Sequence, residues 1–347
     1  MACLCLLPFA LSLLPAAARA AAWEKQRTGT FAWLHSVFFV DERRGWAAGG
    51  KGALLSTADG GETWEARKPP TEDALRDIFF QDAQTGWLVC ERSMFMPMEK
   101  EESVSYLLKT TDGGASWSRV EVTRGADVDV KLAGLRFADR EHGWVYGELG
   151  ALFTTEDGGG SWTRQRVPTR HLLLGGSFLD ARTGWLSGGG LTVLKTSDGG
   201  ATWRAGTIFL PPVVKEDSKY VPREPAGQGE SEQRPVGGRR LNAVWFTTRE
   251  RGWAVGGEGL ILATGDGGRT WRPQDSGVAA DLYDVRFFDE SEGWAVGRDG
   301  VMLHTADGGR TWAETKRVTT HSFERLFTIG RRAWAVGFGG TVVALKG

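Results

Sequence analysis

Aspartates recur in this chain within one repeated motif, and carboxylates can serve in acid–base catalysis and in the binding of hard metal ions. The motif has the consensus Thr-x-Asp-Gly-Gly-x-Thr-Trp, and its aspartates are Asp59, Asp112, Asp157, Asp198, Asp266 and Asp307. Six copies spread through a chain cannot converge on one substrate. The Asp and Thr side chains can instead bond to backbone N–H groups of their own tight turn, and Gly-Gly tolerates positive φ there. We therefore predict that all six are structural.

A glycoside hydrolase would need paired carboxylates or an activated nucleophile. The candidates near the starts of predicted inner strands are Asp77, Tyr283, Asp284 and Glu324, with Arg76 close by. A sialidase would also require an arginine triad and an Arg-Ile-Pro motif, and the sequence has no Arg-Ile-Pro. We predict no catalytic residues and keep a sialidase-like or other Asp-box glycoside hydrolase as the alternative.

Other catalytic and cofactor motifs are missing from the sequence. No Cys/His spacing suggests zinc, no Ser-His-Asp context is visible, and Gly49 to Gly52 lacks the spacing of a phosphate loop. We therefore expect no metal and no cofactor. Cys90 is flanked by Leu88 and Val89, which favours a small buried core residue over a nucleophile.

The elements that would carry these residues follow from a second repeated feature, a Gly-Trp pair. Its tryptophans are Trp46, Trp87, Trp144, Trp185, Trp253, Trp294 and, with Ala333 in place of Gly, Trp334. The base period is about 41 residues, which is typical of a propeller or solenoid. Four short strands separated by Gly- and Asp-rich turns fit each period, so we predict an all-β fold.

The seventh unit lacks an Asp box and ends after its third strand, at Val342 to Leu345. The segment from Trp23 to Arg27 matches the strand that follows each box elsewhere. A last repeat completed by the start of the chain makes sense only in a closed ring, which also removes exposed sheet edges. We therefore predict a seven-bladed β-propeller over residues 21–347 in which Trp23 to Arg27 is the outermost strand of blade seven.

Composition and the first residues bear on location and partners. A formal net charge of −1 gives no general attraction to nucleic acid or to an anionic membrane. Residues 1–20 contain an apolar run from Leu4 to Leu14 and an Ala-x-Ala site ending at Ala20, typical of a signal peptide and too short to span a bilayer. An apolar first strand is the alternative. We expect an exported protein, periplasmic or extracellular, with no membrane span in its mature chain.

Two insertions interrupt the period. In a propeller the turns between strands two and three share one face with the links between blades, here called the top face, and the Asp boxes lie on the opposite, bottom face. Both insertions, Glu91 to Tyr106 and Gly206 to Arg240, are expected on the top face, and insertions on one face often mark the binding face. The first is Met-rich, and flexible thioethers suit a promiscuous apolar contact. The second is rich in Pro and charge, as in an extended linker.

The predicted partner-binding residues belong to these insertions and to the basic links between blades, because Arg can recognise carboxylates of a polypeptide. Loops that fold back on their own blade or are simply solvated are the alternatives. The predicted set is Met94, Phe95, Met96, Met98, Arg124, Arg166, Arg170, Arg239, Arg240 and Arg317.

The Asp box together with Gly-Trp-Ala-Val-Gly resembles BNR or Asp-box propellers, and among these it is most similar to the photosystem II assembly and stability factor family. The resemblance covers Trp23 to Gly347. It implies a chaperone-like factor that binds unassembled membrane-protein subunits in a lumen or periplasm. Sialidases, xyloglucan-degrading enzymes and sorting receptors carry the same box, so the box predicts the fold better than the function. We interpret the chain as a non-catalytic binding scaffold with a protein or peptide partner.

Overall fold

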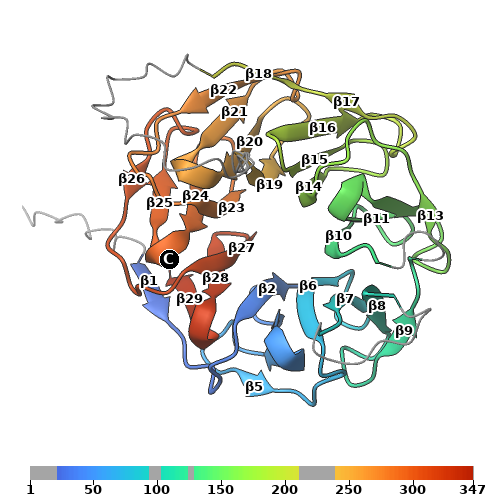
Figure 1. Ribbon diagram of the computed structural model, residues 1–347. Coiled ribbons are helices and arrows are strands. Elements are labelled where there is room, and N and C mark those ends of the chain that lie inside the picture. The colour runs from blue at the N-terminus through green and yellow to red at the C-terminus, as the bar shows by residue number, and fades with distance from the viewer. Residues whose placement is uncertain (1–21, 94–102, 124–128, 211–238, 347) are drawn as a thin grey trace, which may run out of the picture.

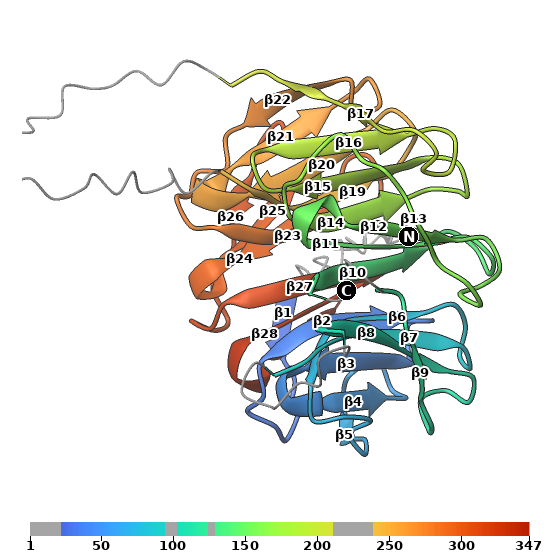
Figure 2. The ribbon, with the colours of Figure 1, turned by 45° about the vertical axis from the view of Figure 1, so that its right-hand side comes forward.

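The computed structural model describes residues 22–93, 103–123, 129–210 and 239–346, which form a ring of seven antiparallel sheets around a central channel (Figure 1). Each sheet is one blade, with its first strand beside the channel and its last at the rim. The predicted seven-bladed β-propeller is therefore confirmed. Figure 2 shows the same ring from a second direction, with the blades twisted as β-sheets normally are.

The strands of the seven blades occupy equivalent positions in each repeat. The inner strands are β2 (Leu34–Phe39), β6 (Ala74–Phe80), β10 (Leu132–Phe137), β14 (Leu173–Phe178), β19 (Leu241–Phe246), β23 (Leu282–Phe287) and β27 (Phe323–Ile329). The second strands are β3 (Gly45–Gly49), β7 (Gly86–Glu91), β11 (Gly143–Gly147), β15 (Gly184–Gly188), β20 (Gly252–Gly256), β24 (Gly293–Gly297) and β28 (Arg332–Gly337). The third strands are β4 (Leu54–Thr57), β8 (Ser105–Thr110), β12 (Leu152–Thr155), β16 (Thr192–Thr196), β21 (Ile261–Thr264), β25 (Met302–Thr305) and β29 (Val342–Lys346). The outer strands are β5 (Glu65–Ala66), β9 (Ser118–Val120), β13 (Thr163–Arg164), β17 (Arg204–Ala205), β22 (Thr270–Gln274), β26 (Ala313–Glu314) and β1 (Ala22–Lys25).

The turns between second and third strands lie on the top face. In five blades the described residues of this turn form a short 3₁₀ turn, namely η1 (Gly50–Gly52), η3 (Glu148–Gly150), η4 (Gly257–Gly259), η5 (Arg298–Gly300) and η6 (Phe338–Gly340). In blade four, residues 189–191 form a turn without 3₁₀ geometry.

The ring closes as predicted. Strand β1 pairs antiparallel with β29, with Trp23 opposite Leu345, so the two ends of the described chain share blade seven. Figure 1 shows the blue β1 beside the red β29. A closed ring leaves no inner blade face without a neighbour, and each buried cluster lies where adjacent blades meet.

Stacked aromatic rings join consecutive blades. The phenylalanine that ends an inner strand stacks on the Gly-Trp tryptophan of the preceding blade: the ring centroids of Phe39 and Trp334 are 3.7 Å apart. The tryptophan after the Asp box, such as Trp64, meets the same phenylalanine edge-on. The pattern repeats in the pairs Phe80–Trp46, Phe137–Trp87, Phe178–Trp144, Phe246–Trp185 and Phe287–Trp253.

The same stack explains why glycine precedes these tryptophans. A Cβ on Gly45 would lie 2.4 Å from the ring of Phe39, well inside van der Waals contact. In blade seven the inner strand has Thr328 at the Phe position, and Ala333 replaces the glycine opposite it. The smaller Thr328 leaves room for a Cβ. Trp23 then packs directly on Trp294, with centroids 5.2 Å apart.

The Asp boxes are tight turns held by hydrogen bonds among their own residues. Asp59 Oδ1 accepts hydrogen bonds from the Thr57 hydroxyl (2.8 Å) and the Thr63 N–H (3.0 Å), and Asp59 Oδ2 accepts one from the Thr63 hydroxyl (2.6 Å). These bonds, led by that from the Thr63 side chain, lower the pKa of Asp59 to about 2. The indole N–H of Trp334 donates to the Gly60 carbonyl at 2.8 Å, so the box also anchors the preceding blade.

The described parts of the two predicted insertions are more regular than expected. Strand β7 extends to Glu91 and β8 begins at Ser105, so blade two takes residues from both ends of the first insertion. In the second insertion, Thr207–Ile208 forms β18, which pairs in parallel with β22 at the rim of blade five. The extra strand caps an edge that would otherwise be exposed. Residues 94–102 and 211–238 lie outside the described residues.

Candidate functional site

The inner strands present two consecutive side chains to the central channel. In a regular strand successive side chains point to opposite faces. Each inner strand here has a register shift between its first and third equivalent residues, as between Leu34 and Ser36 or Leu75 and Asp77. Such a bulge turns an extra residue to the same side. Each inner strand therefore contributes one more side chain to the channel wall than a regular strand would.

The channel has a cavity at each end. The cavity on the top face, here called the top mouth, has a volume of about 460 Å³. The residues that line it are Trp33, His35, Arg76, Glu91, Lys131, Leu132, Ala133, Glu148, Leu172, Leu174, Arg240, Asn242, Tyr283, Glu324 and Arg325. The cavity on the bottom face, here called the bottom bowl, has a volume of about 610 Å³. The aromatic residues that line it are Phe38, Phe79, Phe137, Phe178, Trp245, Phe246, Phe287, Phe288 and Phe327.

The top mouth is polar and mixed in charge. Glu91 accepts hydrogen bonds from Arg76 (2.6 Å) and Lys131 (2.9 Å). Burial opposes the ionisation of Glu91, but the bonds from Lys131 and Arg76 outweigh it and lower its pKa. Burial and the nearby Arg76 charge lower the pKa of His35 to about 4, so this imidazole is neutral at pH 7. Burial raises the pKa of Glu324. The mouth therefore offers both cationic and polar groups to a ligand.

Two buried aspartates in the channel wall connect blades. Asp77 accepts hydrogen bonds from the Ser36 hydroxyl (2.7 Å), the Leu135 N–H (3.0 Å) and Arg136 Nη1 (2.7 Å), and so joins blades one, two and three. Burial opposes the ionisation of Asp77, but the charges of Arg136 and Arg325 and the Ser36 bond keep its pKa lowered.

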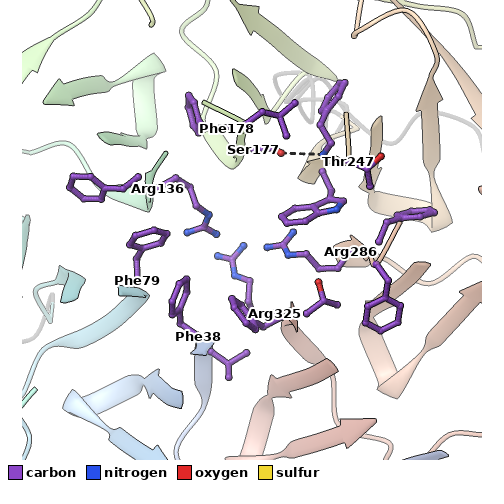
Figure 3. Close-up of a pocket in the computed structure, with 18 of the residues that line it drawn as sticks. Phe38, Phe79, Arg136, Ser177, Phe178, Thr247, Arg286 and Arg325 are labelled. Atoms are coloured by element: carbon purple, nitrogen blue, oxygen red, sulfur yellow. Dashed lines mark hydrogen bonds between the residues drawn. The ribbon is translucent and has the colours of Figure 1, made fainter. Parts of the chain in front are cut away.

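The second buried aspartate plays the same part between blades six and seven. Asp284 accepts from Arg286 Nη1 (2.8 Å) and from the Leu326 N–H (3.0 Å). In blade four the Ser177 hydroxyl takes this role and accepts from the Phe246 N–H at 3.1 Å (Figure 3). These contacts make Asp77 and Asp284 structural links between blades.

The residues of the glycoside hydrolase alternative are therefore divided between two environments. Asp77 and Asp284 are 1% and 0% exposed and fully engaged by neighbouring blades. Arg76, Tyr283 and Glu324 line the top mouth. Burial is the largest cause of the raised pKa of Tyr283. The structure thus separates the candidate carboxylates instead of pairing them across one open site.

The predicted partner-binding arginines are spread over the top face. Arg240 lines the top mouth, whereas Arg239 pairs with Glu258 at 3.4 Å and Arg317 with Glu314 at 2.7 Å. Arg166 and Arg170 are exposed. The predicted residues Met94, Phe95, Met96, Met98 and Arg124 lie outside the described residues. Partner binding by the arginines of the links between blades and by the Met-rich insertion therefore remains a prediction.

Sequence reasoning missed an exposed aromatic patch beside the top mouth. It consists of Phe31 (93% exposed), Trp33 (44%) and Phe338 (51%), and the Trp33 and Phe338 ring centroids lie 5.6 Å apart. A signal for it was present. Trp33 and Trp245 are the two tryptophans outside the two repeat columns, and they line the top mouth and the bottom bowl respectively. A tryptophan that the repeat does not explain marks each end of the channel.

Two further observations apply to the described part of the chain alone. It contains no group of three or more His, Cys, Asp and Glu side chains arranged to hold a metal ion. Nor does any helix within it have the length and apolar character needed to cross a bilayer. Cys90 is fully buried, in agreement with the predicted core role, and burial raises the pKa of its thiol.

Comparison with solved structures confirms the architecture. A structure of YCF48 bound to D1 peptide superposes with a TM-score of 0.70 at 20% identity, covering 94% of this chain and 97% of that one. YCF48 from Cyanidioschyzon merolae gives 0.68 at 20% identity, with 94% and 98% covered. The GH74 xyloglucanase from Xanthomonas campestris gives 0.65 at 12% identity, with 93% and 53% covered. At these identities the similarity shows the fold alone.

Sequence comparison is more specific. The chloroplastic photosystem II stability/assembly factor HCF136 of Arabidopsis thaliana is 32% identical over 82 residues, which are 22% of this chain. The match spans only about a fifth of that relative, 20% of its length. The family model described as photosynthesis system II assembly factor YCF48 matches residues 15–75, 68–172 and 234–324, well over half of the chain. The chain therefore belongs to the YCF48 family of photosystem II assembly factors.

Proposed function

We propose that this protein is an exported, non-catalytic scaffold that binds a polypeptide on its top face. The observation that carries the proposal is the aromatic patch of Phe31, Trp33 and Phe338 beside the basic residues of the top mouth. Interface hot spots are enriched in large aromatic side chains and arginine, and a contiguous exposed apolar patch often marks an interaction site.

The arrangement suits a polypeptide better than a small neutral ligand. Arg76 and Arg240 lie in the same mouth as Trp33, so an apolar side chain and a carboxylate of one segment can be held together. The YCF48 structure that superposes with a TM-score of 0.70 is bound to a D1 peptide, which supports a peptide partner for this family member as well. By the same analogy the partner is an unassembled membrane-protein subunit.

Export and the predicted loops belong to the same proposal. The apolar run and Ala-x-Ala site of residues 1–20 support delivery to the periplasm or the extracellular space. The Met-rich insertion and the basic links would extend the contact surface around the top mouth. The separation of the candidate carboxylates supports binding over glycoside hydrolysis.

The test is affinity capture from the exported fraction of the source cells, followed by mass spectrometry. The wild-type protein is compared with a triple variant, Phe31→Ser, Trp33→Ser and Phe338→Ser. The matched control is Phe209→Ser, which removes an exposed aromatic ring (47%) at the rim of blade five. The proposal expects one or more polypeptides lost with the triple variant and retained with the control. Equal capture by all three proteins would refute it.

A further inference from the structure

The bottom bowl is a second binding cavity on the face opposite the proposed polypeptide site. Its wall is made by rings at equivalent positions of four inner strands, namely Phe38, Phe79, Trp245 and Phe327. The Phe38 centroid lies 4.8 Å from that of Phe79 and 4.9 Å from that of Phe327, so three of these rings form a continuous apolar arc. Its volume of about 610 Å³ is that of a small-molecule pocket.

Three arginines form the floor of this bowl. Figure 3 shows the guanidinium groups of Arg136, Arg286 and Arg325 pointing toward one another into the cavity from three different blades. The side chains are only 18%, 8% and 12% exposed, so water solvates them poorly. Arg286 also lies 4.6 Å from the centre of the Trp245 ring, which fixes its position.

The donors of these arginines are incompletely used. Arg136 and Arg286 each direct Nη1 to an aspartate and to a backbone carbonyl. Arg325 has no closer ion partner among the described residues than Asp77 at 4.0 Å, and its buried Nε has no hydrogen-bond partner there. A buried donor without an acceptor is unfavourable, so the floor is suited to accept one more anionic group.

The charges at the floor of the bowl also favour an anionic ligand. Asp77 and Asp284 supply two negative charges against the three guanidinium groups. Burial lowers the pKa of Arg286 to about 10, which leaves it charged at pH 7. Asp289 and Glu290 also line the bowl, but they do not cancel this excess of positive charge. Asp289 lies 3.5 Å from Arg331, and Glu290 lies 3.1 Å from Arg251, so both carboxylates already have cationic partners. Among the described residues the bowl floor therefore holds one more cation than carboxylate, and Glu324, which lines the top mouth, interacts with Arg325 from the opposite side.

We propose that the bottom bowl binds a small carboxylic acid with an aromatic body. Its carboxylate lies against Arg325 and Arg286, and its ring packs among Phe38, Phe79 and Trp245. Arginine matches a carboxylate through parallel N–H donors, and the poorly hydrated floor strengthens that attraction. This site opens on the face opposite the polypeptide site, and Arg325 is the residue that lines both cavities.

The experiment is isothermal titration of the full chain at pH 7 with 3-phenylpropionate. The matched ligands are 3-phenylpropionamide, which keeps the shape and loses the charge, and propionate, which keeps the charge and loses the ring. The bowl variant is Asp284→Asn with Arg286→Gln, which removes both partners of a buried pair together and so limits the cost to folding. Trp245→Leu is a second bowl variant, and Arg76→Gln in the top mouth is the control.

The proposal expects one site for 3-phenylpropionate and binding of the amide and of propionate weaker by about 10- to 100-fold. Both bowl variants should weaken binding at least about tenfold, while Arg76→Gln and the triple aromatic variant change it less than about twofold. Equal binding of acid and amide, no binding of the acid, or equal loss in Arg76→Gln would overturn the proposal.

A tetrapeptide Gly-Gly-Gly-Phe and its C-terminal amide distinguish the source of the carboxylate. If 3-phenylpropionate binds more tightly than the free-acid peptide, the natural ligand is identified as a free small acid. Tighter binding of the free-acid peptide, lost on amidation, would identify a polypeptide chain end as the ligand and would overturn the proposal of a small acid. Equal binding of the two peptides would show that the carboxylate is not recognised and would also contradict the proposal.

Discussion

Removal of the Asp77 carboxylate should destabilise the ring without any involvement of a ligand. In Asp77→Ala the buried Arg136 loses its ion pair, and the Ser36 hydroxyl and the Leu135 N–H each lose an acceptor. Breaking one partner of a buried pair costs about 3–5 kcal/mol. We expect the free energy of unfolding to fall by about that amount, because Asp77 joins three blades and its side chain is only 1% exposed.

Urea unfolding followed by both tryptophan fluorescence and circular dichroism measures this loss. The double variant Asp77→Leu with Arg136→Met should be less destabilised than the sum of the two single changes, since it leaves no unpaired buried charge. A loss in Asp77→Ala below about 1 kcal/mol would refute the reasoning, as would additivity within about 0.5 kcal/mol.

The pH dependence supplies an independent check. The folded-state pKa of Asp77 is lowered below its unfolded value of about 3.9. Its contribution is therefore complete above the unfolded pKa and is lost as pH falls through the folded pKa. Wild-type stability should fall with acid more than that of the double variant does.

Three further predictions concern the repeat and the core. Asp59→Ala or Asp266→Ala should lower stability by about 0.5–2 kcal/mol in urea unfolding through lost turn hydrogen bonds and leave partner capture intact; selective loss of capture with unchanged stability would argue for a binding role. Because the pKa of both aspartates is lowered to about 2, this contribution should disappear as pH falls from about 4 through 2. Gly86→Ala should lower the free energy of unfolding by about 1–3 kcal/mol, because its Cβ would lie 2.5 Å from the Phe80 ring. Phe80→Leu in the same chain should recover part of that loss. Equal melting temperatures of Gly86→Ala and wild type would contradict the steric argument. Cys90 should react with a thiol reagent such as DTNB only after unfolding, because burial raises its pKa; rapid labelling of the native protein would be the opposite result.

The fold followed from the sequence because each blade repeats the same contacts. Paired tryptophan columns and Asp boxes predict where strands begin and turn, and the partial seventh unit predicts closure through Trp23. Even the exception in that unit has a local cause, since Thr328 and Ala333 occupy the positions where other blades have Phe and Gly.

The channel lining was less predictable. Arg136 and Arg286 occupy one position of the inner strand, and Arg325 occupies the position two residues earlier, which faces the same side. The three residues come from three different blades, and it is the closed ring that brings them to a common floor. The parallel pairing of Thr207–Ile208 with β22 also depends on a long-range contact that a Pro-rich segment does not indicate.

The partner-binding residues of the top face were predicted from their positions in loops, without knowledge of the side chains that surround them in the fold. Arg240 lines the top mouth, but Arg239 and Arg317 have acidic neighbours on nearby turns that the sequence alone does not place beside them. The exposed patch escaped notice because Phe31 and Phe338 are ordinary apolar residues in the sequence, and their exposure appears only when the described blades are folded.

Site-specific photo-crosslinking in cells tests polypeptide binding on the top face most directly. A benzoylphenylalanine at Phe338 reports on the top face, and one at Leu179, which lines the bottom bowl and is 36% exposed, reports on the bottom face. Polypeptide binding on the top face predicts discrete polypeptide adducts from position 338 and none from position 179. Adducts of equal yield at both positions, or only at position 179, would contradict it.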